Sequence, residues 1–193
     1  MLFIAPGTWD GGSIELLCLF RRPPVPSNAE IHASIWSWSR LAGPYLSNKT
    51  EPNEQVACDP RDIEATYGVA SLPGQIGQVA FETTFVEDSD GAWLYAGVPL
   101  GSLGGLLPVG AFLFGEACIK DWEHIVYSWL YGLAEHVYEQ QKFERAIVGW
   151  LTTLEVDELA ERHVPEVRSH GYIVPIHEKL VYYPPNRKSA LLE

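Results

Sequence analysis

The chain has 193 residues, of which 47% are hydrophobic and 20% are charged. This is ordinary globular composition, and it excludes a wholly disordered chain and collagen-like or coiled-coil repeats. Thirteen Lys and Arg against 25 Asp and Glu give a formal net charge of −12, which disfavours a surface that binds nucleic-acid phosphates or an anionic membrane. A basic protein is the kind of partner that this charge favours.

The N-terminal stretch and the cysteines predict a cytoplasmic protein. Residues 1–10 lack the basic start and the long apolar run of a secretory signal. The cysteines are odd in number and widely spaced, at Cys18, Cys58 and Cys118. We therefore expect free thiols in a reducing compartment rather than a disulfide framework.

The first part of the chain predicts two strands and a helix. Residues 2–5 and 13–21 have the apolar character of strands, and the second is apolar enough to lie in the centre of a sheet. Ser27 and Glu30 form a capping box at the start of a helix. Trp36 lies off the apolar stripe of this helix, and Gly43-Pro44 is expected to end it. The stripe itself consists of Ile31, Ile35, Trp38, Leu41 and Ala42.

The middle of the chain passes from an irregular stretch into a hairpin. Residues 44–76 are polar and rich in turn formers, and Asp59-Pro60 is a candidate start of a short helix. Apolar and polar residues alternate from Gln78 to Val86, which is typical of a half-buried strand. After it we expect a turn over 87–91, a returning strand over 92–98 and a third strand over 109–114.

The last third of the chain predicts a long helix and a closing hairpin. The helix is expected from Asp121 to Gln141, because its apolar residues recur at intervals of three and four. Residues 143–151 fit either a helix or a strand, and 153–160 fit a short helix. The closing strands are 172–176 and 180–183, with Pro175 placing one of them at a sheet edge.

These elements favour the α+β class, because they do not repeat strand–helix–strand units. We expect a single globular domain over 1–185, followed by a tail over 186–193. It would hold a mixed or antiparallel sheet, with a long amphipathic helix and shorter helices packed on one side. The uncharged stretch 92–115 is long enough for a membrane helix, but it contains six glycines and two prolines between acidic flanks. We expect buried strands joined by a glycine-rich loop there, and no membrane contact.

No strong catalytic or metal-binding motif stands out. The six histidines lack ligand spacing, so we expect neither a metal nor another cofactor. The glycines around Ser102 resemble a nucleophile elbow only loosely, and His177 stands beside Glu178 in the closing hairpin. Two alternatives stay open. One is a small hydrolase that uses Ser102 and His177, and the other is a ligand-binding or structural subunit that buries 92–115.

Aromatic residues and acidic clusters together indicate a protein-binding surface. Phe, Trp and Tyr make up 12% of the chain, and several of them fall off the apolar stripes. Interfaces favour Trp and Tyr as anchors, and acidic loops complement a basic partner and speed its encounter. The expected partner-binding residues are Glu51, Glu54, Glu87, Asp88, Asp90, Trp122 and Glu123.

In size, acidity and composition, the chain resembles the immunity proteins that protect bacteria from antibacterial effector toxins. The resemblance implies a tight, stoichiometric complex with a cognate toxin and no turnover. Such a toxin is often a nuclease with a basic cleft, where an acidic protein presents carboxylates in place of phosphates. Because the resemblance matches no residue string, it assigns no role to a single residue, and the oligomeric state stays open.

Overall fold

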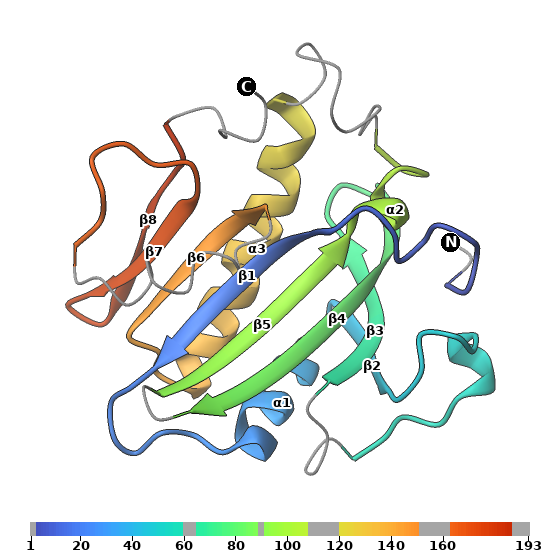
Figure 1. Cartoon of the computed structure of the whole chain (residues 1–193), viewed down its shortest axis with the longest axis horizontal. Coiled ribbons are helices and arrows are strands. Elements are labelled where there is room, and N and C mark those ends of the chain that lie inside the picture. Colours follow the sequence, from blue (N-terminus) through green and yellow to red (C-terminus); the bar gives the residue numbers. More distant parts are fainter. Residues whose placement is uncertain (1–2, 60–64, 89–90, 108–119, 151–162, 187–193) are drawn as a thin grey trace.

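Within the residues that the computed structural model describes (3–59, 65–88, 91–107, 120–150 and 163–186), eight antiparallel strands form one sheet. Their order across it is β2-β3-β4-β5-β1-β6-β7-β8 (Figure 1). The strands are β1 (Ser13–Phe20), β2 (Leu41–Tyr45), β3 (Ala65–Leu72), β4 (Gly77–Asp88), β5 (Gly91–Pro99), β6 (Arg145–Trp150), β7 (Gly171–Ile176) and β8 (Lys179–Tyr183). The helices are α1 (Asn28–Trp36), the 3-10 turn η1 (Pro52–Glu54), α2 (Leu100–Leu103) and α3 (Lys120–Gln140). This architecture agrees with the α+β class.

Strand β1 lies in the interior of the sheet, as its apolar run predicts. All eight of its residues are buried, with β5 on one side and β6 on the other. Successive side chains of a strand point to opposite faces, so β1 supplies two cores. Ile14, Leu16, Cys18 and Phe20 belong to the main core, and Leu17 and Leu19 belong to the smaller core behind it.

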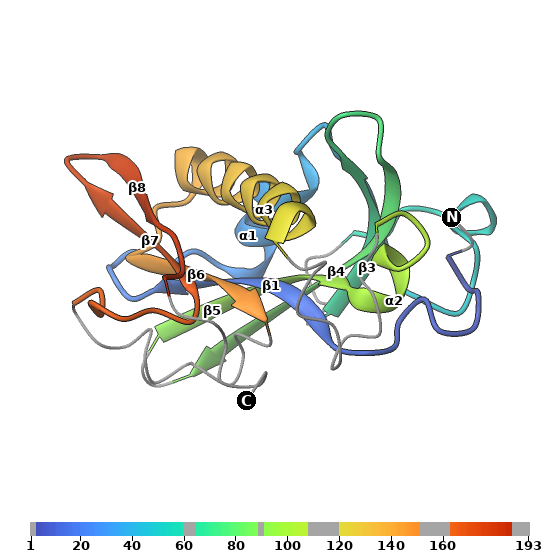
Figure 2. The ribbon, with the colours of Figure 1, turned by 90° about the horizontal axis from the view of Figure 1, so that it is seen from above.

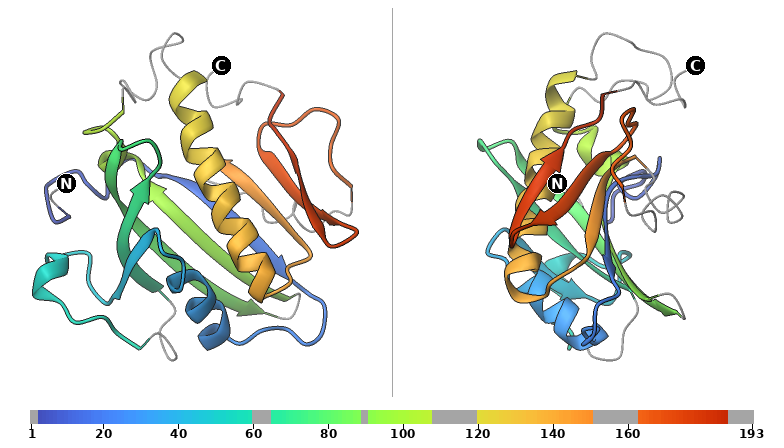
Figure 3. Two further views of the ribbon diagram at one scale, coloured as in Figure 1. Left: turned by 180° about the vertical axis from the view of Figure 1, so that it is seen from behind. Right: turned by 90° about the vertical axis from the view of Figure 1, so that its left-hand side faces the viewer.

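Helices α1 and α3 lie over the same face of the sheet (Figures 2 and 3). Helix α3 has 21 residues and begins and ends within one residue of the predicted helix. Helix α1 begins at the predicted capping box, in which Ser27 N donates to Glu30 Oε2 at 2.8 Å and Ser27 Oγ accepts from Glu30 N. The main core forms between these helices and the sheet, with Val126, Leu130, Leu133 and Val137 as the stripe of α3.

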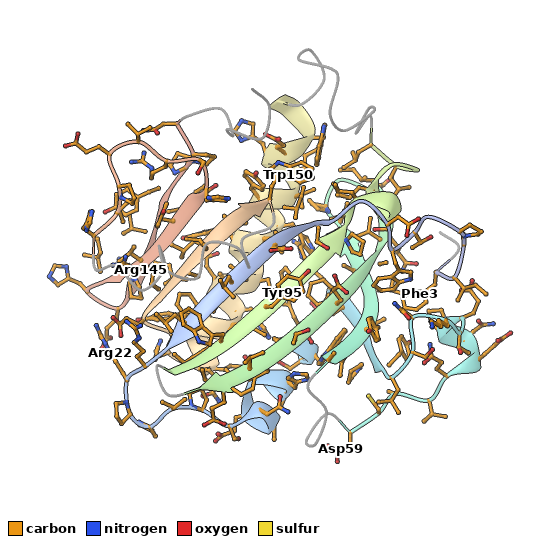
Figure 4. The ribbon with its side chains drawn as sticks, in the orientation of Figure 1. Phe3, Arg22, Asp59, Tyr95, Arg145 and Trp150 are labelled. Atoms are coloured by element: carbon orange, nitrogen blue, oxygen red, sulfur yellow. The ribbon has the colours of Figure 1, made fainter. Side chains whose placement is uncertain are left out.

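The opposite face combines a smaller apolar cluster with a group of polar side chains. Tyr95, in the middle of the view in Figure 4, donates to Glu82 Oε1 at 2.9 Å, and the same oxygen accepts from Ser13 Oγ at 3.2 Å. Burial, and then the charges of Glu82 and Glu15, raise the pKa of the Tyr95 phenol, so it remains a hydrogen-bond donor. The apolar cluster consists of Leu17, Leu19, Trp93, Ile147 and Tyr172.

Three expectations about local structure are wrong. Residues 3–5 form turns rather than a strand. The first helix ends at Trp36, so Leu41 and Ala42 of its expected stripe open strand β2 instead. Strand β3 crosses the stretch that we expect to be irregular. The chain therefore leaves helix α1 earlier than its apolar spacing indicates and adds two strands to one edge of the sheet.

Trp36 connects helix α1 to these two strands. Its ring packs edge-on against Phe81, with centroids 5.7 Å apart, and its Nε1 donates to Thr66 Oγ1 at 3.1 Å. Glycines leave room for the ring, since a Cβ on Gly68 would lie 2.4 Å from Trp36 Cη2 and one on Gly43 would lie 2.8 Å from Cζ3. Gly43, which in the sequence looks like a helix stop, is therefore a strand residue that accommodates an indole.

Both predicted hairpins are confirmed, and 143–151 is resolved as strand β6. The expectation that Pro175 marks an edge strand is wrong, because β7 lies between β6 and β8. Pro175 lies beyond the last residue of β7 that pairs with β6, where its missing N–H leaves no ladder bond unmade. No helix within the described ranges is long and apolar enough to cross a membrane. The expected helix start at 60, strand over 109–114, helix over 153–160 and tail beyond 186 lie outside the described residues.

Candidate partner-binding surface

The loop over residues 46–57 follows strand β2 at the edge of the sheet. The chain leaves the sheet after Tyr45, passes through η1 and returns at Cys58, whose N–H donates to the carbonyl of Pro44 at 2.8 Å. This hydrogen bond closes the base of the loop. We call residues 46–57 the 46–57 loop.

The side chain of Gln55 holds the 46–57 loop in shape. Its Oε1 accepts from Ser47 N at 3.2 Å, and its Nε2 donates to Ser47 O at 2.9 Å and to Thr50 O at 2.7 Å. Ser47 Oγ also accepts from the N–H of Lys49 at 3.0 Å. These bonds satisfy backbone groups that a loop otherwise leaves to water, so the loop has a defined conformation before any partner binds.

Large apolar side chains on and beside this loop face solvent. Val56 is 90% exposed and Leu46 is 60% exposed. Ile4, which is 46% exposed, is tied to the loop because its N–H donates to Glu51 Oε1 at 3.3 Å. The N-terminal segment and η1 accordingly lie on the same side of the molecule (Figures 1 and 3).

An aromatic cluster packs the N-terminal segment against the sheet. Phe3 is buried, and its ring lies edge-on to Trp9 at 5.0 Å and to Tyr45 at 6.5 Å. Trp9 in turn lies edge-on to Tyr67 at 5.3 Å, and its Nε1 donates to Phe3 O at 2.9 Å. Edge-to-face aromatic pairs add stabilisation beyond buried area, so the segment that presents Ile4 is fixed to the sheet.

The 46–57 loop is also acidic. Glu54 is exposed and Glu51 is half-buried, and Asp59 lies exposed just beyond the base. Lys49 is the one Lys or Arg between residues 44 and 59. The loop therefore combines negative charge with exposed apolar surface, and it contains two of the seven predicted partner-binding residues.

The predicted residues at the β4–β5 hairpin lie elsewhere. Glu87 is exposed near the end of β4, where it pairs with Ala92, and Asp88 ends the strand opposite Gly91. Asp90 is outside the described residues. Because Ala92 of β5 pairs with Phe20, the last residue of β1, this hairpin lies at one end of the central strands.

The predicted residues at the start of α3 lie at the other end of those strands, beside Trp150, which pairs with Ile14 of β1. Trp122 is only 3% exposed and packs edge-on against Trp150, so the expectation that it lies off the core is wrong. Glu123 is half-buried and accepts from Trp150 Nε1 at 3.2 Å, and burial raises its pKa. Its environment explains the error: sequence spacing placed Trp122 off the α3 stripe but could not show that β6 ends against it.

The six predicted residues that the structure describes thus fall into three separate places rather than one surface. Sequence reasoning missed the exposed apolar residues Ile4, Leu46 and Val56. Their signal was weak but present, since Leu46 and Val56 flank the polar stretch 47–55, which has no helical or strand period. Such residues have no element to bury them.

The residues of the hydrolase alternative are not brought together. Ser102 is buried in α2, where its Oγ donates to the carbonyl of Pro99 at 2.8 Å. His177 is exposed in the turn between β7 and β8, at φ +49°. Helix α2 and this hairpin lie on opposite sides of the molecule (Figures 1 and 2). A nucleophile needs its base within hydrogen-bond reach, so this pair does not form a catalytic site.

Among the described residues, no three His, Cys, Asp or Glu side chains gather as a metal site. Cys18 is buried in the main core, and desolvation raises the pKa of its thiol.

Comparison with protein-family models, curated proteins and solved structures gives no match to this chain. Its function is therefore inferred from the surface described above.

Proposed function

We propose that this protein binds and neutralises a basic partner protein, an antibacterial nuclease-type toxin, by forming a stoichiometric complex in the bacterial cytoplasm. The observation that carries the proposal is the 46–57 loop, on which exposed apolar side chains and carboxylates occur together on a loop held by its own hydrogen bonds. In this role the protein acts as an immunity protein, without a cofactor and without contact to nucleic acid or membrane.

The apolar part of the loop supplies the affinity. A side chain as exposed as Val56 gains free energy when a partner removes it from water, at roughly 25 cal/mol per Å² of apolar surface. Leu46 on the same loop and Ile4, which is bonded to the loop through Glu51, are further exposed apolar side chains. Interfaces typically surround such an apolar centre with a polar rim, which Glu51 and Glu54 provide here.

The negative charge of the loop makes binding selective for a basic partner. A nuclease holds phosphates with clustered Lys and Arg, and an acidic surface complements that cluster. With a net charge of −12, long-range attraction accelerates the encounter and makes it dependent on salt. The same charge discourages binding to other acidic proteins and to nucleic acid.

The hydrogen bonds of Gln55 lower the entropic cost of binding. A loop that is ordered only in the complex loses conformational entropy on association, and that loss subtracts from affinity. Because Gln55 connects Ser47 and Thr50 before binding, this loss is smaller for the 46–57 loop. The loop is therefore suited to a tight complex.

The experiment captures the partner on the tagged protein from its native lysate, washed at low and at high salt, and then measures binding of the two purified proteins. We expect one basic protein at a one-to-one ratio. Val56→Ser is expected to weaken its affinity by about tenfold, or roughly 1.4 kcal/mol, through faster dissociation. Glu54→Lys is expected to slow association, with a weaker dependence on salt.

Two further variants test whether the 46–57 loop is the surface that binds the partner. Glu139→Lys reverses an exposed charge on α3 and leaves binding unchanged if the loop is the interface. Reversal of Glu87, Asp88 and Asp90 tests the β4–β5 hairpin instead. If only that triple variant slows association, the partner sits on the hairpin and the loop is the wrong surface. If no stoichiometric basic partner is retained, or if none of the variants alters its binding, neutralisation itself is the wrong function.

A further inference from the structure

A cleft of about 530 Å³ lies between helix α1 and the end of strand β2, at the base of the 46–57 loop. Its apolar walls are Ala29, Ala33 and Trp36 of α1 and Pro44 of β2. The Trp36 wall is rigid, because its Nε1 is bonded to Thr66 and its ring lies against Gly43 and Gly68. The cleft is therefore a formed feature with one fixed aromatic side.

Two carboxylates stand at the cleft. Glu30 is exposed on α1, and its carboxylate is held by both the N–H and the hydroxyl of Ser27, each at 2.8 Å. These hydrogen bonds lower the pKa of Glu30, so it is ionised at neutral pH. Asp59, labelled in Figure 4, is exposed on the chain that returns from the loop. No Lys or Arg occurs among the described residues that line the cleft.

His32 adds a polar group without adding a positive charge. It lines the cleft and is 0% exposed, and its Nδ1 lies 3.5 Å from Thr66 Oγ1. Its Nε2 has no hydrogen-bond partner among the residues that the structure describes. Burial lowers the pKa of His32 to about 4, so the imidazole is neutral at pH 7. In the tautomer that carries its proton on Nδ1, Nε2 is an acceptor, and leaving such a buried atom without a partner is unfavourable.

We propose that this cleft binds the side chain of an arginine on the partner protein. The three methylenes of arginine pack against the walls formed by Ala33, Trp36 and Pro44, and the guanidinium lies between Glu30 and Asp59. A guanidinium fits this lining better than an ammonium, because it is weakly hydrated, stacks on aromatic rings and donates to two carboxylates at once.

The inference rests on the proposed function and extends it to a specific contact. The cleft and the 46–57 loop are continuous, since Pro44 forms a wall and accepts from Cys58 N at the base of the loop. A partner seated on Val56 therefore reaches the cleft without a second binding site. Anchor residues of this kind, with a long side chain in a pocket beside an apolar patch, typically dominate interface energetics.

A titration with small probes tests the cleft without the partner. Nα-acetyl-arginine methylamide is added to the ¹⁵N-labelled protein, and Nα-acetyl-citrulline methylamide, which has nearly the same shape but no charge, serves as the matched control. We expect the arginine compound to shift amide signals in α1 and at Gly43, with the citrulline compound at least tenfold weaker. A lysine compound of the same form separates guanidinium from ammonium recognition. Equal shifts with citrulline, or no shifts with arginine, overturn the proposal.

Two variants connect this titration to the partner. Ala33→Leu fills the cleft on the exposed side of α1, and Asp59→Asn removes one of its two charges. Both are expected to weaken binding of the arginine compound, by about tenfold for Ala33→Leu, whereas Glu139→Gln, at an exposed position of α3, leaves it unchanged. If the partner binds the Ala33→Leu protein with normal affinity, the cleft is not its arginine site, although neutralisation through the loop stands. If the arginine compound binds as expected but no partner is found, the cleft stands and the proposed function fails.

Discussion

At one edge of the sheet, strand β8 accepts a hydrogen bond from helix α3. At the other edge, strand β2 accepts a hydrogen bond from the end of the loop that follows it. On the first edge, Tyr131 of α3 donates to the carbonyl of Leu180 at 3.2 Å, and its ring lies 5.6 Å from the ring of Tyr182. On the second edge, the carbonyl of Pro44 accepts from Cys58. Both hydrogen bonds satisfy backbone carbonyls that could otherwise pair with a strand of another chain.

The two edges differ in the side chains that they expose to solvent. The aromatic contact at β8 covers the edge with side chains that are themselves half-buried. The loop at β2 instead leaves Leu46 and Val56 in solvent and adds carboxylates beside them. An edge can therefore be closed to strand pairing and still offer a surface for a side-chain interface, as the β2 edge does.

The largest effect is expected from Gly68→Ala, which breaks the β2 edge. The new Cβ would lie 2.4 Å from Trp36 Cη2 and 2.5 Å from the carbonyl oxygen of Ala42. Since the second contact is with backbone of the neighbouring strand, rotation of the tryptophan alone does not relieve it. We expect the free energy of unfolding to fall by about 3 kcal/mol, measured by urea denaturation. Gly105→Ala, where a Cβ meets open space, is the control and should change it by less than about 0.5 kcal/mol.

The next effect concerns pH and the helix that supports the β2 edge. The pKa of His32 is about 4 in the folded protein, below its value of about 6.5 in an unfolded chain. The unfolded state therefore takes up a proton first as the pH falls. The stability that neutral His32 contributes is complete above pH 6.5 and is lost between pH 6.5 and pH 4, with a size of about 3 kcal/mol.

The variant His32→Gln isolates this contribution. Its free energy of unfolding is expected to fall less than that of the parent protein between pH 7 and pH 4.5, because the remaining titrating groups are common to both proteins. Urea denaturation at several pH values checks the difference. Parallel pH profiles for the two proteins would mean that His32 accepts a proton in the folded state, against the burial that the structure gives it.

The sequence predicted the elements whose residues are sufficient to define them. The apolar run of β1 needs no information beyond itself to indicate a central strand. The capping box of α1 and the stripe of α3 are likewise local patterns, and the closing hairpin is set by its alternation and turn. For each of these, tertiary packing agrees with local preference.

The elements that sequence reasoning missed depend on one distant contact. Gly43 and Gly68 are poor strand residues by propensity, and both are needed because the indole of Trp36 occupies the space of their side chains. The candidate surface was only partly predicted for a similar reason. Acidity at Glu51 and Glu54 is visible in the sequence, but the exposure of Leu46 and Val56 follows from the path that Gln55 imposes on the loop.

A smaller effect is expected at the β8 edge. Tyr131→Phe keeps the ring against Tyr182 but removes the donor to Leu180 O. We expect a loss of about 1 kcal/mol in the free energy of unfolding, since the variant removes the hydrogen bond to Leu180 O and the interaction of the hydroxyl with Glu135. Amide exchange in β8 should quicken more than amide exchange in β1. Unchanged stability together with unchanged exchange in β8 would show that this edge does not depend on the helix.

The smallest effect on stability is expected from Gln55→Ala. This variant also tests most directly whether the loop at the β2 edge is held in one conformation. The variant removes three hydrogen bonds from the 46–57 loop, but the loop contributes little to either core, so the free energy of unfolding should change by only about 0.5 kcal/mol. Amide exchange at Ser47 should instead become several times faster, because its N–H loses its acceptor.

The control for this variant is Asn53→Ala, on the same loop, whose exposed side chain has no hydrogen bond to the described residues. If partner binding depends on a loop that is ordered in advance, Gln55→Ala weakens affinity while Asn53→Ala does not, although both leave the exposed apolar residues in place. Equal affinities would mean that the apolar and acidic groups act without the order that Gln55 imposes. The loop would then differ from the β8 edge only in what it exposes, and not in how rigidly it is held.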